Sequence, residues 1–157
     1  MKAARFSVTM ALTFIAASRS MAGEAECEAV VAALMQMVRQ PIVRQTDTRS
    51  DFPGAITMIF AEQAMYVSAG GTWKTMEVPA ARRISDMQLL LQATPPTECT
   101  SGATEAVDGL DAVAYAFRQG PEAVRIWVGT ADGLPYRLQG GVVDSRIDYA
   151  GVVVPVP

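Results

Sequence analysis

The chain has 157 residues, half of them hydrophobic and 18% charged, with a formal net charge of −3 and no histidine. This length suits one domain around a single core. The acidic balance argues against binding to nucleic acid, because a phosphate backbone is bound by a basic surface. The absence of histidine from the sequence excludes hydrolases of the Ser-His and Cys-His types.

The N-terminal segment, residues 1–22, is predicted to be a cleavable signal peptide. Two positive charges precede an apolar stretch, and Ser20 and Ala22 provide the small residues that signal peptidase requires. The stretch is too short to span a membrane, which takes about 20 apolar residues. We therefore expect a periplasmic or secreted protein with one domain over residues 23–157. Cleavage would remove three of the 13 basic residues and none of the 16 acidic ones, so the net charge would become −6.

The two cysteines, Cys27 and Cys99, are predicted to form a disulfide, because thiols tend to pair in an oxidising compartment. A metal site or a nucleophilic cysteine would need further ligands or a helper base. The sequence has no histidine to supply either, so we expect no metal and no cofactor.

Two segments have the spacing of amphipathic helices. In residues 24–40 apolar side chains recur at steps of three and four, and Pro41 ends the pattern. Residues 80–93 repeat this spacing and are followed by Pro95 and Pro96. The polar segment 97–102, which contains Cys99, is expected to be an exposed loop.

The remaining segments have the two-residue period of β-strands. Glycines at 70 and 71 predict a hairpin between two of these runs, because glycine adopts positive φ at little cost. The predicted strands cover residues 42–48, 55–61, 65–68, 72–78, 103–107, 112–118, 123–129, 134–139 and 147–154.

The order of these elements predicts an α+β fold. The links between strands are too short for parallel crossovers, so neighbouring strands should pair antiparallel. We expect a curved antiparallel β-sheet, an open half-barrel of roughly five to eight strands, with the two helices covering its concave face.

A stretch near the C-terminus resembles a known family. In residues 123–137 a strand with the apolar triplet around Trp127 turns through Gly-Leu-Pro at 133–135 into the next strand. This resembles the hairpin of the LolA-like and LppX-like periplasmic lipoprotein carriers, and residues 147–155 resemble their last strand. The resemblance implies a half-barrel whose helices enclose a hydrophobic cavity for the acyl chains of lipids or lipoproteins.

Aromatic and methionine side chains on the predicted strands are candidates for the lining of such a cavity, and methionine adapts to varied apolar ligands. The alternative is ordinary core packing, which is the commoner role of such residues. The candidates are Met58, Phe60, Met65, Trp73, Met76, Tyr115, Phe117 and Trp127.

Three arginines on adjacent predicted strands, Arg118, Arg125 and Arg137, allow two interpretations. They form either a basic stripe for an anionic head group or a solvated outer face paired with acidic neighbours.

Two pairs of aspartates can be interpreted as catalytic carboxylates or as a weak calcium site: Asp108 with Asp111, and Asp144 with Asp148. Both pairs fall near turns, where aspartate is favoured because it hydrogen-bonds nearby backbone amides. No catalytic residue is predicted.

We therefore expect an exported, non-enzymatic binding or carrier protein that holds an apolar or lipidic ligand in the half-barrel cavity. Its partners would be a lipid, an acyl chain or a lipoprotein, or another envelope protein. The alternative is a structural or interaction module of the cell envelope with a filled core and no ligand.

Overall fold

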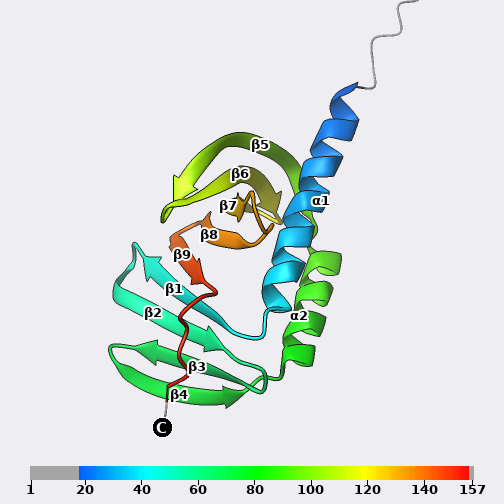
Figure 1. Ribbon diagram of the computed structural model, residues 1–157. Helices are drawn as coiled ribbons and strands as arrows, with labels where there is room; N and C mark the ends of the chain where they lie inside the picture. The colour runs from blue at the N-terminus through cyan, green and yellow to red at the C-terminus, as the bar shows by residue number, and fades with distance from the viewer. Residues whose placement is uncertain (1–17, 156–157) are drawn as a thin grey trace, which may run out of the picture.

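The computed structural model describes residues 18–155, and over this range it consists of two helices and one sheet of nine strands. The prediction of a signal peptide falls mainly on residues 1–17, which lie outside the described range. Figure 1 shows a strongly curved sheet with both helices on the same side of it. The elements are α1 (Ser18–Val38), β1 (Val43–Arg49), β2 (Phe52–Phe60), β3 (Ala64–Ala69), β4 (Thr72–Glu77), α2 (Ala80–Ala93), β5 (Pro96–Val107), β6 (Leu110–Gln119), β7 (Glu122–Gly129), β8 (Pro135–Gly140) and β9 (Val143–Asp148).

The strands follow the order β4-β3-β2-β1-β9-β8-β7-β6-β5, and each neighbouring pair is antiparallel. Two meanders, β1 to β4 and β5 to β9, are joined where Arg44 of β1 pairs with Asp148 of β9. Within the described chain β4 and β5 do not pair with each other, so the sheet stays open. The predicted α+β half-barrel is confirmed. The expected number of strands was too low, because nine strands form, of which the ninth, Val143–Asp148, overlaps its predicted run by only two residues.

Several boundaries differ from the prediction, among them the start of α1, which lies at Ser18 rather than at residue 24. Residues 97–102 are not a loop but the first half of β5, whose register shifts twice, between Thr97 and Thr100 and between Ser101 and Thr104. These irregularities disturb the two-residue period that identifies a strand in sequence. In addition, β2 starts at Phe52 rather than residue 55.

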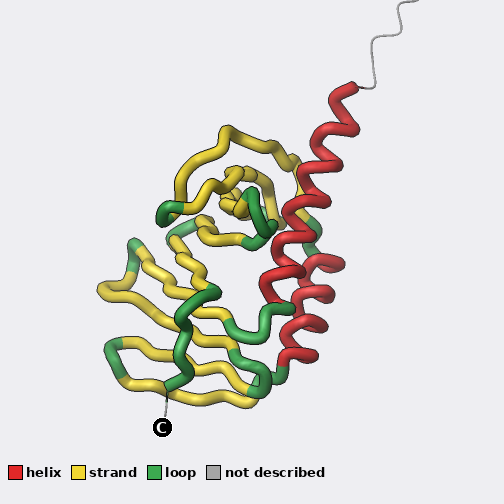
Figure 2. Tube along the Cα trace, in the orientation of Figure 1, coloured by secondary structure: helices red, strands yellow, loops and turns green. Residues whose placement is uncertain are grey.

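The last strand ends at Asp148, whereas the sequence pattern placed a strand over 147–154. The segment that follows, through Pro155, forms no regular element. Figure 2 shows it as a loop that crosses the sheet from β9 towards β4. Gly151 has φ of 66° there, a conformation that ends the extended backbone.

The predicted hairpin between β3 and β4 is confirmed, with Gly70 and Gly71 at φ of 76° and 96°. Both predicted helices are also present, and α2 spans the predicted residues. None of the helices in the part of the chain that is described has the length and hydropathy needed to cross a bilayer.

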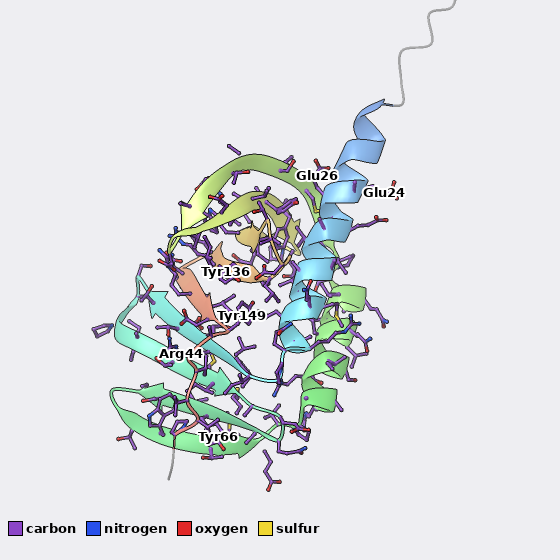
Figure 3. The ribbon with its side chains drawn as sticks, viewed as in Figure 1. Glu24, Glu26, Arg44, Tyr66, Tyr136 and Tyr149 are labelled. Atoms are coloured by element: carbon purple, nitrogen blue, oxygen red, sulfur yellow. A yellow bond between two sulfur atoms is a disulfide. The ribbon has the colours of Figure 1, made fainter. Side chains whose placement is uncertain are left out.

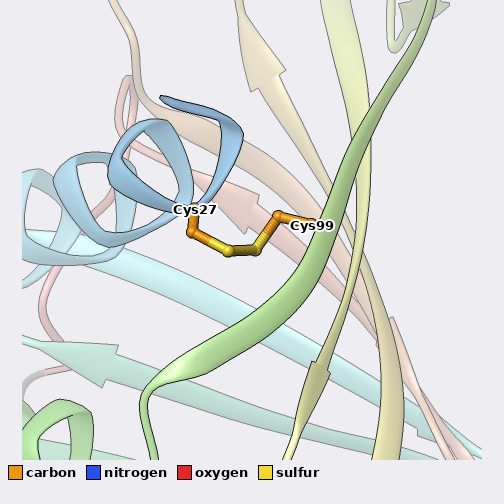
Figure 4. The surroundings of a disulfide bond; sticks show 2 residues. All are labelled: Cys27 and Cys99. Atoms are coloured by element: carbon orange, nitrogen blue, oxygen red, sulfur yellow. A yellow bond between two sulfur atoms is a disulfide. The ribbon is translucent and has the colours of Figure 1, made fainter. Parts of the chain in front are cut away.

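The main core lies between α1 and the second meander. Val30, Ala33 and Leu34 project from one face of α1 and pack against Phe117 of β6 and Ile126 of β7. The predicted disulfide between Cys27 of α1 and Cys99 of β5 is present, with the two Cα atoms 5.2 Å apart (Figure 4). It fixes the first half of α1 to the edge strand of the sheet.

Candidate functional site: an apolar cavity beneath the helices

A cavity of about 350 Å³ lies between the two helices and the first meander. It is bounded by the C-terminal end of α1, the inner face of β1 and β2, the end of β4 and one face of α2. Its lining is mainly aliphatic. The residues are Met37, Val38, Val43, Gln45, Phe60, Val78, Arg83, Asp86, Met87 and Leu90.

The packing of the helices explains this space. The first half of α1 lies directly on β5, to which the disulfide ties it, and α2 packs beside α1. In contrast, α2 makes few contacts with the sheet, so the inner face of β1 and β2 is not filled from above. Leu90 lines the cavity and is 48% exposed, so the cavity reaches the surface beside α2.

Arg83 is the unusual member of this lining, because it is a charged side chain only 8% exposed. Its Nη1 donates to the carbonyl oxygen of Ala61, and the guanidinium lies 5.7 Å from the centre of the Phe60 ring. Its Nη2 is shielded from solvent and has no acceptor among the described residues. Burial lowers the pKa of Arg83 from its usual value, but an arginine remains charged at neutral pH.

The structure separates the eight cavity candidates into three groups. Phe60 lines the cavity. Met65 pairs with Phe60 and with Met76 across the sheet, and Met58 lies two residues before Phe60, so these methionines share its helix-facing side. Met76 on β4 does not line the cavity and is 45% exposed.

Phe117 and Tyr115 of β6 also face the helices but lie under α1. Phe117 belongs to the buried core, and Tyr115 packs against that core and borders a shallow groove beside α1. Trp73 and Trp127 lie on the opposite face of the sheet. Trp73 is near the C-terminal segment at Val153, and Trp127 is buried in a second, smaller core.

Two solved structures resemble this architecture. LprF of Mycobacterium bovis superposes with a TM-score of 0.49 at 14% identity, over 85% of this chain and 97% of LprF. The lipoprotein LppX of Mycobacterium tuberculosis superposes with a TM-score of 0.50 at 10% identity, over 84% of this chain and 99% of LppX. The chain has the LppX-like half-barrel fold. At this identity the likeness concerns the fold, which the short C-terminal resemblance had indicated. No protein-family model matches the sequence, and no curated protein matches it significantly.

The outer face of this LppX-like sheet carries a cluster of charges around Trp127. The guanidinium groups of Arg125 and Arg137 lie 4.7 and 4.6 Å from its ring centre, and its indole nitrogen donates to Glu105 at 3.2 Å. Glu105 also pairs with Arg125, and Asp144 pairs with Arg137. The positive and negative charges around Trp127 therefore neutralise each other. This agrees with the interpretation of these arginines as part of a solvated outer face paired with acidic neighbours.

The third arginine of the proposed basic stripe, Arg118, donates to the backbone carbonyl of Pro121 in the adjacent turn. It takes no part in the cluster around Trp127. The structure therefore does not bring the three arginines together as a basic stripe.

The two aspartate pairs are divided among separate contacts. Asp108 pairs with Arg146 and Asp148 with Arg44, each at 3.0 Å. The backbone carbonyl of Asp111 accepts a hydrogen bond from Thr130. The described residues contain no group of three or more acidic or cysteine side chains arranged to hold a metal ion.

The Gly-Leu-Pro turn between β7 and β8 is a structural anchor. Asp132 accepts hydrogen bonds from the backbone N–H of Leu134 and from the hydroxyl of Tyr136. A Cβ at Gly129 would lie 2.6 Å from the Asp132 carboxylate, so the turn closes tightly only with glycine there. Burial and the Asp132 carboxylate raise the pKa of Tyr136 to about 12.

Tyr149 completes this anchor from the segment after β9. Its ring meets that of Tyr136 edge-on at 5.5 Å, and its hydroxyl donates to the carbonyl of Pro135 at 2.6 Å (Figure 3). Burial raises the pKa of Tyr149 as well. The Tyr149 hydroxyl therefore holds the C-terminal segment to β8, while the Tyr136 hydroxyl holds the turn between β7 and β8.

Sequence reasoning did not identify the helical side of the cavity. The apolar stripe of α2, which includes Met87 and Leu90, was recognised as a helix face but not as a ligand surface. Arg83 is not among the candidate site residues that the sequence suggested. A signal existed in the spacing of Arg83, which lies four residues before Met87 and seven before Leu90 and therefore shares their face of the helix, but its burial depends on where the helix docks.

Proposed function

We propose that the protein is a non-enzymatic carrier that binds an apolar or lipidic ligand in the cavity between the helices and the first meander. The observation that carries this proposal is the cavity itself, because a filled core would leave no such space under the helices. The LppX-like fold supports it, since LppX is a lipoprotein with the same architecture. The predicted signal peptide supports a site of action outside the cytoplasm.

The size of the cavity limits the ligand. Its 350 Å³ is at the low end of the range of about 300 to 1,000 Å³ that small-molecule pockets occupy. Taking about 30 Å³ for each small group, it holds roughly a dozen methylene-sized groups. We therefore propose a single acyl chain rather than a lipid with several chains inside the protein.

The methionines next to Phe60 extend the proposed binding surface. Met58 and Met65 continue the helix-facing side of the sheet from Phe60 towards β4, and their partly exposed positions leave them accessible. A chain longer than the cavity would lie along them. Their unbranched side chains adjust to ligands of different shape.

Filling the cavity tests the proposal. Met87→Trp adds volume to the lining, whereas Leu89→Trp, the matched control, changes a residue of the same helix that is 60% exposed and outside the lining. Binding of the neutral fluorescent probe N-phenyl-1-naphthylamine is expected to weaken about tenfold or more in Met87→Trp and to stay unchanged in Leu89→Trp. Circular dichroism checks that both variants are folded. A wild-type protein that binds neither the probe nor any fatty acid or alcohol would refute carriage.

The alternative, an interaction module, is favoured by one observation. Every residue of the edge strand β4 is exposed, and its outer side pairs with no other strand of the described chain. Such an edge can pair with a strand of another protein, although Lys74 on it opposes this. Lys74→Val is expected to promote association through the edge, which sedimentation velocity would detect. A monomeric variant would count against the module.

A further inference from the structure

The cavity contains a positive charge that no residue around it neutralises. Among the described residues that line it, only Arg83 is cationic, and no carboxylate of the described chain lies within ion-pair distance of its guanidinium. A buried charge is costly unless it is paired and hydrogen-bonded. The hydrogen bond from Nη1 to Ala61 and the contact with the Phe60 ring compensate part of this cost. Nη2 has no acceptor among the described residues.

Asp86 also lines the cavity, but it does not supply the missing charge. Its carboxylate lies 3.6 Å from the guanidinium of Arg82, one turn earlier on α2, and its side chain is largely exposed. It therefore lies at the solvent end of the lining, where water screens it. The inner part of the cavity combines a single cation with aliphatic walls.

We infer that the cavity binds an amphiphile with one acyl chain and a carboxylate head group, as in a fatty acid, and that Arg83 receives the head group. This rests on the proposed function and names its ligand class. The planar guanidinium matches a carboxylate through two parallel hydrogen bonds. Nη2 is shielded from solvent and has no acceptor among the described residues, so a carboxylate that reaches it satisfies its hydrogen-bonding capacity. Met37, Val43 and Met87 then surround the chain.

Competition between two matched ligands tests this inference. Dodecanoic acid and dodecan-1-ol have the same chain and differ in the head group. Each is titrated at neutral pH against N-phenyl-1-naphthylamine bound to the purified protein. The wild type is expected to bind the acid about tenfold more tightly than the alcohol, since hydrogen bonds to ionised groups are the stronger ones.

Three variants assign the preference to one side chain. Arg83→Met keeps an unbranched side chain but lacks the charge, so the preference for the acid should disappear while the alcohol still binds. Arg82→Met, the matched control, removes the exposed arginine next to it and should leave the preference intact. Arg83→Lys retains the charge without the planar fork and should keep part of the preference.

The outcomes separate this inference from the proposed function. If the wild type binds both ligands equally, the carboxylate inference is wrong and carriage of an apolar chain stands. This comparison needs no variant, so it remains decisive even if Arg83→Met does not fold. A preference that survives in folded Arg83→Met would also overturn the inference. If neither ligand displaces the probe, both proposals fail.

Discussion

Replacing Cys27 and Cys99 together by alanine should destabilise the protein by about 4 kcal/mol. The disulfide joins residues that are 72 positions apart, and closing a loop of this length removes about 4 kcal/mol of chain entropy from the unfolded state. The loop contains the whole first meander and α2. The bridge therefore constrains the unfolded chain over all elements that surround the cavity.

Urea denaturation followed by tryptophan fluorescence measures this loss. The oxidised wild type and the double alanine variant are compared, and wild type reduced with a phosphine serves as a second sample without the bridge. The double variant is expected to have a lower midpoint and a steeper dependence of unfolding free energy on urea, because its unfolded chain exposes more surface. The variant should still fold, since Val30 and Leu34 hold α1 on the sheet independently.

A loss of less than about 1 kcal/mol, with an unchanged urea dependence, would refute the reasoning. It would mean that the unfolded chain already keeps α1 close to β5. Alkylation of the native protein gives an independent check, since the oxidised wild type is expected to expose no reactive thiol. Two alkylated cysteines without reduction would show that the bridge does not form.

Three further predictions concern packing and titration. Ile126→Ala empties a fully buried site between α1 and the sheet and should cost about 3 kcal/mol in chemical denaturation. Arg137 lowers the pKa of Asp144, so this pair stabilises the fold above the unfolded pKa of about 4 and the effect is lost as pH falls through the lowered value. Asp144→Asn should therefore cost about 1 kcal/mol at neutral pH, and the difference from wild type should vanish in acid. The raised pKa of Tyr136 predicts a tyrosinate absorbance step near pH 12 that Tyr136→Phe removes.

Each of these has a result that would contradict it. An Ile126→Ala variant as stable as the wild type would show that the core closes around the missing atoms. If the difference in stability between wild type and Asp144→Asn does not change with pH, the ion pair with Arg137 is not its cause. If the step near pH 12 persists in Tyr136→Phe, another group produces it.

The sequence determined most of the secondary structure. The residues of α2 were predicted in full because its apolar spacing, its polar face and the prolines after it all agree. The hairpin at Gly70 and Gly71 depends on the local conformations of two glycines. The disulfide followed from the presence of two cysteines in a chain predicted to be exported. Each of these signals is local or compositional, so the sequence contains it directly.

The tertiary structure decided the strand β5 and the location of the cavity. The bulges of β5 depend on its pairing with β6, so the sequence from Thr97 to Thr104 lacks a strand period. The alternation of side chains along a strand also predicts which residues share a face with Trp73 or with Phe60. It does not predict which face the helices cover. Long-range docking of α1 and α2 on the sheet sets that choice.

Arg83 illustrates this division most clearly. Its position on α2 follows from the sequence, and an arginine beside an apolar stripe is usually solvated. Only the packing of α2 against Phe60 and Ala61 buries its charge in the cavity wall. The sequence thus determined the elements and their amphipathic faces, which depend on local spacing. The tertiary structure determined which faces meet and what space remains between them, because these depend on contacts between distant residues.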